Sequence, residues 1–251
     1  MAGKEDQEAG AVLVWERPER GARGPAPERS REQLTAAAIG LADGGGLAAV
    51  SVRQVARELG TGPASLYRYV AGRDDLVDLM VDAVTGEIDL DVELTGDPVA
   101  DLVALAARTQ EVQLRHPWLL EVAPEAMRVG PRGLDYLEFA LRALEPVADL
   151  TGQRKLEAVA VLNALVAMLS GVELRARRSP TGRQAAQSAY LGAVAGRGGH
   201  PLLARALAGG AAGGPAGGNQ PGAGASGEAG ARFERVVRRV LAGLLAADPL
   251  T

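Results

Sequence analysis

Residues 51–69 read SVRQVARELGTGPASLYRY, and this stretch predicts two short helices joined by a tight turn. Ser51 is a favourable N-cap, and four apolar residues follow it at helical spacing: Val52, Val55, Ala56 and Leu59. Gly60 stands where a helix ends in a left-handed residue, and Pro63 suits the first turn of the next helix. Helix, glycine turn and helix form the pattern of helix-turn-helix units that bind DNA.

The region around this stretch is basic, although the whole chain carries a net charge of −4. Between Arg17 and Arg73, nine arginines stand against five acidic residues. Binding to nucleic acid depends on local rather than total charge, so this surplus is compatible with a phosphate-binding face. Surface arginines are also common on other proteins, and charge alone does not separate the two interpretations.

Composition predicts an all-α fold. Aromatic residues make up 3 % of the chain, so the core must consist of Ala, Leu and Val, most of them in helix-forming segments. No apolar run reaches the roughly 18 uncharged residues that a bilayer span requires, and no secretory signal pattern is visible. The chain has no cysteine, which excludes disulfides and thiolate chemistry. We therefore expect a cytoplasmic protein without a membrane partner.

Three parts follow one another along the chain. Residues 1–29 are polar and rich in Pro, Gly and Arg, which predicts a flexible basic arm. The arm fits contact with phosphates or the minor groove, and it fits a solubilising tail equally well. Within it, residues 12–15 (VLVW) form an apolar patch that is expected to dock on the body of the protein.

Residues 30–88 are expected to form the helix-turn-helix domain with a connector helix. Ser30 caps a helix to about Asp43, GlyGlyGly at 44–46 stops it, and a fourth helix runs from Asp74 to Ile88. Residues 96–247 predict a larger helical domain. Its first expected helix begins at Pro98, and further helices are expected at residues 133–147, 153–178, 181–194, 202–208 and 232–245. Residues 196–230 are expected to form a flexible Gly/Ala-rich loop.

The motifs SVRQVARELG, TGPASLYRYV and GRDDLVDLM, within residues 30–84, resemble those of TetR-family transcriptional repressors. Beyond residue 84 the resemblance is architectural, and it is closest to members with a tetracycline-repressor-like C-terminal domain. The resemblance implies an N-terminal three-helix helix-turn-helix domain and a C-terminal helical domain that binds a ligand and dimerises.

The resemblance also implies DNA-binding roles for eight residues: Ser51, Arg53, Pro63, Ala64, Ser65, Tyr67, Tyr69 and Arg73. Residues 63–65 would face base edges, while Tyr67 and Arg73 would contact phosphates. Because residues 63–65 offer few hydrogen-bonding groups, sequence readout is expected to depend on Arg53, the basic arm and DNA shape.

A small-molecule effector site is implied in the C-terminal domain. Asn163 is an amide within an apolar helix and must find a partner in the protein or in a ligand. His116 lacks the companions of a metal site, and Trp118 is more often a core residue than a chemical one. The expected lining is His116, Trp118, Met127, Tyr136, Phe139, Asn163, Val166 and Met168, with no metal and no cofactor.

Together these features predict a transcriptional regulator, a repressor that a small molecule releases from a palindromic operator. The apolar helices at 153–178 and 231–246 would form a homodimer interface. An activator or architectural DNA-binding protein without a ligand, or a helical interaction protein, stays open as an alternative. An enzyme is not expected, because the sequence shows no phosphate loop, no cysteine nucleophile and no histidine in a triad or metal cluster.

Overall fold

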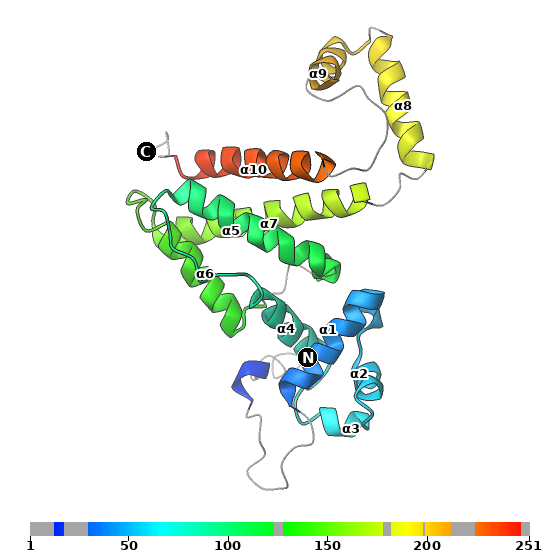
Figure 1. The fold of residues 1–251 in the computed structure, drawn as a ribbon, viewed down its shortest axis with the longest axis vertical. Coiled ribbons are helices and arrows are strands. Elements are labelled where there is room, and N and C mark those ends of the chain that lie inside the picture. Colours follow the sequence, from blue (N-terminus) through cyan, green and yellow to red (C-terminus); the bar gives the residue numbers. More distant parts are fainter. Residues whose placement is uncertain are drawn as a thin grey trace, which may run out of the picture. The chain divides into compact units, whose positions relative to one another are not determined.

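A computed structural model describes residues 13–17, 30–122, 128–177, 182–197, 199–211 and 224–246. All regular secondary structure in these residues is helical, which confirms the all-α prediction (Figure 1). The chain divides into two compact units, residues 1–170 with 234–251, and residues 171–233.

The first unit begins with the helix-turn-helix region. It contains α1 (Arg31–Gly45), the short η2 (Leu47–Ala49), α2 (Val52–Glu58) and α3 (Pro63–Leu66). Ser30 caps α1 and Ser51 caps α2, each by accepting a backbone N–H three residues later through its hydroxyl oxygen. The apolar side chains of Leu34, Val55 and Leu66 are fully buried where these helices meet.

The connector helix α4 (Arg73–Thr85) lies between this region and the larger helices of the same unit (Figure 1). It packs against α1, and it also packs against α5 (Pro98–Arg115) and α6 (Pro131–Ala143). The short η3 (Pro117–Glu121) follows α5 and reaches back to α1. The contacts of α4 agree with the expectation that this helix links the two domains.

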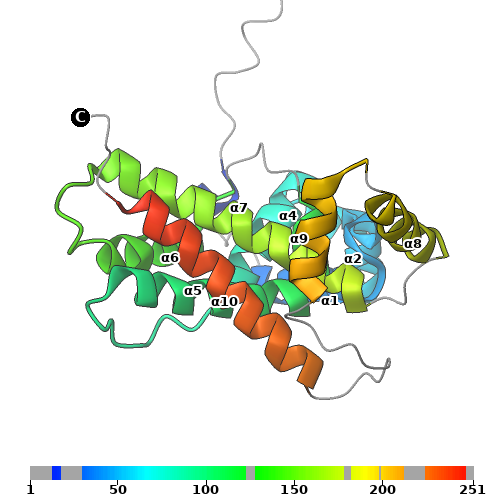
Figure 2. The same ribbon diagram turned by 90° about the horizontal axis from the view of Figure 1, so that it is seen from above.

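The first unit also contains residues 152–170 of the long helix α7 (Gly152–Arg177) and residues 234–244 of the last helix α10 (Gly224–Leu244). These two stretches lie alongside each other in Figures 1 and 2. Buried residues of α7 recur at helical spacing (Val159, Leu162, Val166), and Val237 and Leu241 of α10 are fully buried. In the second unit, α8 (Gly182–Gly196) packs against α9 (Pro201–Ala211).

An N-terminal segment docks on α4, as the apolar patch predicted. The short η1 (Val14–Glu16) contacts α4 and buries Val14 completely. Arg17 then forms an ion pair of 2.6 Å with Asp75 of α4. Of the basic arm expected at 1–29, the structure describes residues 13–17, and residues 1–12 and 18–29 lie outside the described part of the chain.

Several predicted boundaries were wrong. Helix α1 includes Gly44 and Gly45, and only Gly46, with φ of 72°, ends it. The second helix of the motif is shorter than the pattern suggested: it ends at Leu66, and residues 67–69 form a turn. Helix α4 ends three residues before Ile88.

The expected loop at 196–230 is also shorter than predicted. Helix α9 occupies residues 201–211, and α10 begins at Gly224 rather than at Arg232. Residues 224–230 hold three glycines and two alanines, so their own propensity for helix is weak, and they extend a helix that the amphipathic stretch after them stabilises. The intervening residues 212–223 lie outside the described part of the chain.

Helix α7 is the one helix of the described residues that is long and apolar enough to cross a membrane by length and composition. The same test is passed by core helices of soluble proteins, and Glu157 and Glu173 bound its uncharged run. Its buried side packs within the first unit, whereas Val161, Met168 and Val172 form an exposed apolar stripe on another side of the helix. An exposed apolar stripe of this kind is typical of a surface that binds a partner.

Candidate DNA-binding surface and effector cavity

The turn of the helix-turn-helix is built by Gly60. Its φ of 65° is the left-handed conformation that glycine adopts without steric cost. The N–H of Gly60 donates to the carbonyl of Arg57 (3.1 Å), and the N–H of Thr61 donates to the carbonyl of Ala56 (2.9 Å). These two bonds form a Schellman motif, which ends α2 and directs the chain into α3.

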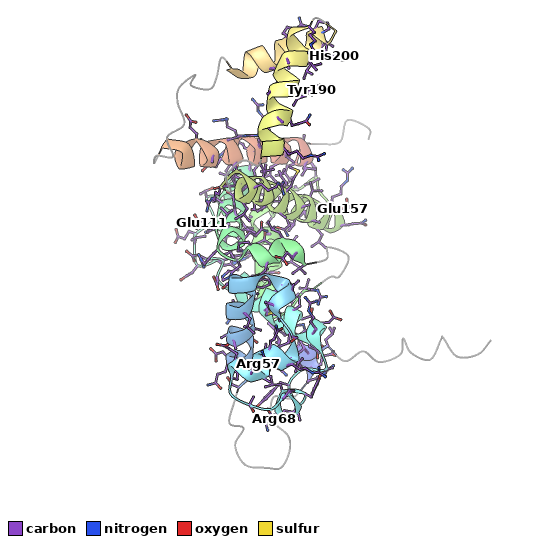
Figure 3. The ribbon with its side chains drawn as sticks, turned by 90° about the vertical axis from the view of Figure 1, so that its right-hand side faces the viewer. Arg57, Arg68, Glu111, Glu157, Tyr190 and His200 are labelled. Atoms are coloured by element: carbon purple, nitrogen blue, oxygen red, sulfur yellow. The ribbon has the colours of Figure 1, made fainter. Side chains whose placement is uncertain are left out.

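The predicted DNA-contacting side chains gather on α2 and α3. Arg53, Pro63, Ala64 and Tyr67 are exposed, and the Tyr67 ring is 55 % exposed although it is large and aromatic. Ser65 is half-buried, because its hydroxyl donates to the carbonyl of Gly62 (2.7 Å) and lies 2.9 Å from the Thr61 hydroxyl. Arg57 and Arg68 also project from this end of the unit (Figure 3). The structure thus brings polar, aromatic and basic groups to one surface.

Three of the predicted contact residues pack or form hydrogen bonds within the protein. Tyr69 is 2 % exposed and belongs to the core of the domain. Ser51 accepts the N–H of Gln54 through its hydroxyl, as the N-cap of α2. Arg73 donates to the backbone carbonyls of Leu47 (2.9 Å) and Val50 (3.2 Å). Arg73 therefore ties the start of α4 to the segment that leads into α2.

A cavity of about 340 Å³ lies among α4, α5, α6 and α7 of the first unit. It is lined by apolar side chains together with a small number of polar groups from five segments: Thr85, Thr109, Gln113, Arg128, Tyr136 and Asn163. A mostly apolar cavity with a few polar groups is the usual form of a small-molecule site.

Tyr136 and Asn163 form the polar centre of this cavity. The Tyr136 hydroxyl donates to the side-chain oxygen of Asn163 at 2.6 Å, so the amide of α7 has the partner that its apolar helix requires. Burial raises the pKa of the Tyr136 hydroxyl, and hydrogen bonds with Thr109 and Asn163 offset this in part. The hydroxyl stays protonated near neutral pH and is available as a hydrogen-bonding group to a ligand.

The other residues expected in the cavity lie elsewhere. His116 and Trp118 turn toward α1, where their ring nitrogens contact one carboxylate oxygen of Asp43 at 2.7 and 2.8 Å. Phe139 is buried with the guanidinium carbons of Arg108 and Arg142 each 5.6 Å from its ring centre, and Val166 is buried in the core. Met168 is 56 % exposed on the stripe of α7, and Met127 lies outside the described residues.

Sequence reasoning missed Thr109, Gln113 and Arg128. Thr109 falls on the apolar stripe of α5 that contains Leu102, Leu105 and Ala106, so a polar residue at this position was a signal that the sequence offered. Arg128 stands in an irregular segment before α6, where no periodicity points to it. Among the described residues, no group of three or more His, Cys, Asp or Glu side chains is placed to hold a metal ion.

Residues 34–80 match the model of bacterial regulatory proteins of the tetR family, and residues 93–247 match the tetracyclin repressor-like C-terminal domain. The transcriptional repressor DrrR1 of Streptomyces coeruleorubidus is 38 % identical over 61 % of this chain and 57 % of its own length. The chain thus spans a little over half of that relative.

A transcriptional regulator of Saccharopolyspora erythraea is 31 % identical over 71 % of this chain and 75 % of its own length. Among solved structures, apo ActR of Streptomyces coelicolor aligns with a TM-score of 0.66 at 25 % identity, covering 88 % of this chain and 97 % of ActR. ActR in complex with (S)-DNPA aligns with a TM-score of 0.65 at 25 % identity, covering 88 % and 98 %. The fold, the motifs and both matched domains show that the chain belongs to the tetR family of bacterial regulatory proteins.

Proposed function

We propose that this protein is a homodimeric transcriptional repressor of the cytoplasm, which binds a palindromic DNA operator and releases it when a small molecule occupies the cavity. It has no catalytic role in this proposal. The observation that carries the proposal is the place of the cavity, which α4 lines with Val81 and Thr85. The same helix begins directly after the helix-turn-helix and is tied to it by Arg73.

Several observations support DNA binding. The exposed groups of α2 and α3 provide donors for phosphates and base edges, and the surrounding region is basic. DrrR1 and the Saccharopolyspora relative carry the names of a transcriptional repressor and a transcriptional regulator. Arg53, Tyr67 and Arg73 are the predicted residues whose side chains are both exposed and polar. Because Arg73 already donates to the carbonyls of Leu47 and Val50, we assign readout to Arg53 and a phosphate contact to Tyr67.

The cavity favours an effector over the alternative of a DNA-binding protein without a ligand. A mostly apolar hollow of about 340 Å³ with a few polar groups is the form that small-molecule sites take, and DNA binding alone does not require one. ActR, a relative in fold, has been solved with (S)-DNPA bound. Ligand binding would shift the population of α4 positions and so change how two recognition surfaces match their half-sites.

The exposed apolar stripe of α7 supports a dimer. Val161 and Met168 are 43 % and 56 % exposed in the single chain, although an isolated surface would favour polar residues there. A two-fold axis through this stripe would bury it against its own copy, because isologous interfaces use the same patch on both subunits. Two helix-turn-helix units would then read half-sites about one helical turn apart.

The test is selection of bound DNA from a random pool with the full-length protein, repeated in the presence of candidate metabolites. A palindromic consensus that is lost with one class of metabolite is the expected result. Enrichment of no sequence would reject operator binding, and a consensus that no metabolite releases would reject the effector.

Tyr67→Phe tests the DNA surface with the least disturbance of the fold, because the ring remains and the exposed hydroxyl is removed. Loss of one phosphate contact should weaken operator binding about three- to tenfold at fixed salt. Arg73→Ala should weaken binding as well, and it also removes two bonds that hold η2. Normal affinity of both variants would overturn the assignment of this surface.

A further inference from the structure

The recognition helix α3 offers almost no side-chain donors to base edges. Pro63 and Ala64 are exposed, but neither side chain has a hydrogen-bonding group. The hydroxyl of Ser65 donates to the carbonyl of Gly62 at 2.7 Å, so its proton is used within the turn. Hydrogen bonds that distinguish one base from another therefore have to come from longer side chains on the same surface.

The arginines around the helix-turn-helix fall into two groups. Those of the first group pair with a carboxylate or donate to backbone carbonyls within the protein: Arg17, Arg31 and Arg73. Arg53, Arg57 and Arg68 form the second group, and all three are exposed. None of these three forms a hydrogen bond or an ion pair with the residues that the structure describes. Their guanidinium groups are therefore available to DNA.

Arg68 differs from Arg53 and Arg57 because an aromatic ring holds it. Its guanidinium carbon lies 4.8 Å from the centre of the Tyr69 ring, and Tyr69 is only 2 % exposed. The ring is thus fixed in the core of the domain and provides a platform for the cation. A contact with an aromatic face engages the charge of the guanidinium and leaves its N–H donors free to bind an acceptor. A side chain that is ordered before binding also loses less conformational freedom when it meets its partner.

Arg68 also stands beside the residues of α3 that are expected to face the bases. The N–H of Val70 donates to the carbonyl of Leu66 at 3.2 Å, so the helical hydrogen-bonding pattern continues past α3. Arg68 follows Ala64 by four residues, about one helical turn, and the two therefore lie on the same side of the helix. Ala64 is among the residues that the family resemblance assigns to base edges. Arg68 lies at the same end of the unit as Arg57 (Figure 3).

We propose that Arg68 determines part of the operator sequence by donating hydrogen bonds to both O6 and N7 of a guanine in the major groove. This bidentate pair is the commonest specific contact of arginine with DNA. The Tyr69 ring holds the guanidinium at the surface before DNA binds. The inference rests on the proposed function in that the surface of α2 and α3 binds DNA, and it requires neither the effector nor the dimer. Arg68 thus joins Arg53 as a reader of sequence.

The experiment measures binding of the full-length protein, without effector, to duplexes derived from the consensus that the wild type selects from a random pool. Each guanine of the consensus is replaced in turn by 7-deazaguanine, which lacks the N7 acceptor but keeps the base pair and the phosphates. At one position the wild type should lose affinity about five- to tenfold in fluorescence anisotropy at fixed salt, the lower end of the discrimination that arginine gives at guanine. Arg68→Met should bind the guanine and 7-deazaguanine duplexes with affinities that agree within about twofold, because the group that reads N7 is gone.

Two outcomes would overturn the inference. A loss of affinity in Arg68→Met that is equal for all duplexes, with a salt slope reduced by about one, would mean that Arg68 contacts a phosphate. A response to 7-deazaguanine that Arg68→Met leaves unchanged would mean that Arg68 only covers the Tyr69 ring.

Arg57→Met is the matched control, because Arg57 is also exposed and unpaired among the described residues but has no ring contact there. It should keep the wild-type response at the position assigned to Arg68. Arg68→Lys keeps the charge and loses the planar fork, so its response to 7-deazaguanine should be weaker than that of the wild type. This variant decides the question if Arg68→Met does not fold, and an undiminished response would count against the inference. A wild type that selects no sequence would reject operator binding and this inference together, whereas a consensus that Arg68→Met selects unchanged would reject this inference alone.

Discussion

Gly130 lies where three segments that are distant in the sequence meet. It precedes α6, and a Cβ added there would lie 2.6 Å from Cζ2 of Trp15 and closer still to the carboxylate of Asp82. Gly130→Ala should therefore lower the free energy of unfolding by about 1–3 kcal/mol, because the Trp15 ring or the Asp82 carboxylate must shift. Urea titration followed by circular dichroism measures this loss.

Gly40→Ala is the matched control for that change. Gly40 lies in the interior of α1 with nothing within 4 Å of the added Cβ, so alanine should raise stability there by up to about 1 kcal/mol. Opposite signs for the two glycines are the expected outcome. A loss of equal size at both positions would show that close packing at Gly130 is not the cause.

Asp82 joins α4 to α6 as a buried charge. Its Oδ1 accepts the N–H groups of Arg132 (2.9 Å) and Gly133 (3.0 Å) at the start of α6. Burial raises the pKa of this carboxyl above its ordinary value of 3.8, against the lowering effect of these hydrogen bonds. The folded protein therefore holds the Asp82 proton to higher pH than the unfolded chain, and this group's contribution to stability falls as pH rises through that interval.

Asp82→Asn should remove this pH dependence. The amide keeps an oxygen that accepts both N–H groups and carries no charge to desolvate. Relative to the wild type, the variant should therefore gain stability between about pH 4 and about pH 7, as measured by urea titration at each pH. Asp82→Ala is the contrasting control and should be destabilised at both pH values, since two N–H groups lose their acceptor. Identical pH profiles for wild type and Asp82→Asn would contradict the shifted pKa.

At this scale, some details were accessible from the sequence and others were not. The need of Asn163 for a partner follows from placing an amide in an apolar helix, and Tyr136 confirms it. The orientation of the His116 and Trp118 rings depends on their contacts with Asp43. Asp43 lies more than seventy residues earlier in the chain, so no local sequence pattern predicts these contacts.

At the scale of elements, η3 is the second bridge between the domains after α4. Asp43 at the end of α1 meets His116 and Trp118, and Nε2 of His116 is 3.2 Å from Glu87 just after α4. Glu121 of η3 accepts the backbone N–H of Leu47 at 3.0 Å. The helix-turn-helix domain is thus fastened to the larger domain by polar contacts as well as by packing.

Asp43→Ala tests this bridge. Two largely buried ring nitrogens would lose their shared acceptor, so the free energy of unfolding should fall by about 1–3 kcal/mol in urea titration. Glu32→Ala is the control, since Glu32 is an exposed acid in the first turn of the same helix and should change stability by less than about 0.5 kcal/mol. Equal small effects for both variants would show that the bridge adds nothing to stability.

The elements themselves were largely predictable because helix signals are local. Caps, the glycine turn and apolar spacing lie within a few residues of one another, so the helix-turn-helix could be recognised before any coordinates. The lining of the cavity could be predicted only in part, because it collects residues from α4 to α7 whose proximity depends on tertiary packing. Arg128 is the clearest case, since it comes from an irregular segment and its partners lie on another helix.

At the scale of the whole molecule, the apolar stripe on α7 decides between a monomer and a dimer. Val161→Glu and Met168→Glu place charges on the stripe and should convert a dimer to a monomer in sedimentation at micromolar concentration, because an interface that buries an unpaired charge is strongly penalised. Leu134→Glu is the control: Leu134 is 60 % exposed on α6, outside the stripe, and the variant should remain dimeric.

The monomeric variants should keep their helical content and the binding of the cavity ligand. They should lose affinity for a two-half-site operator far more than for a single half-site, because the second half-site contributes only when both recognition surfaces are linked. A wild-type protein that sediments as a monomer while binding a palindrome tightly would contradict the interface, and a dimer unaffected by either stripe variant would place it on another face.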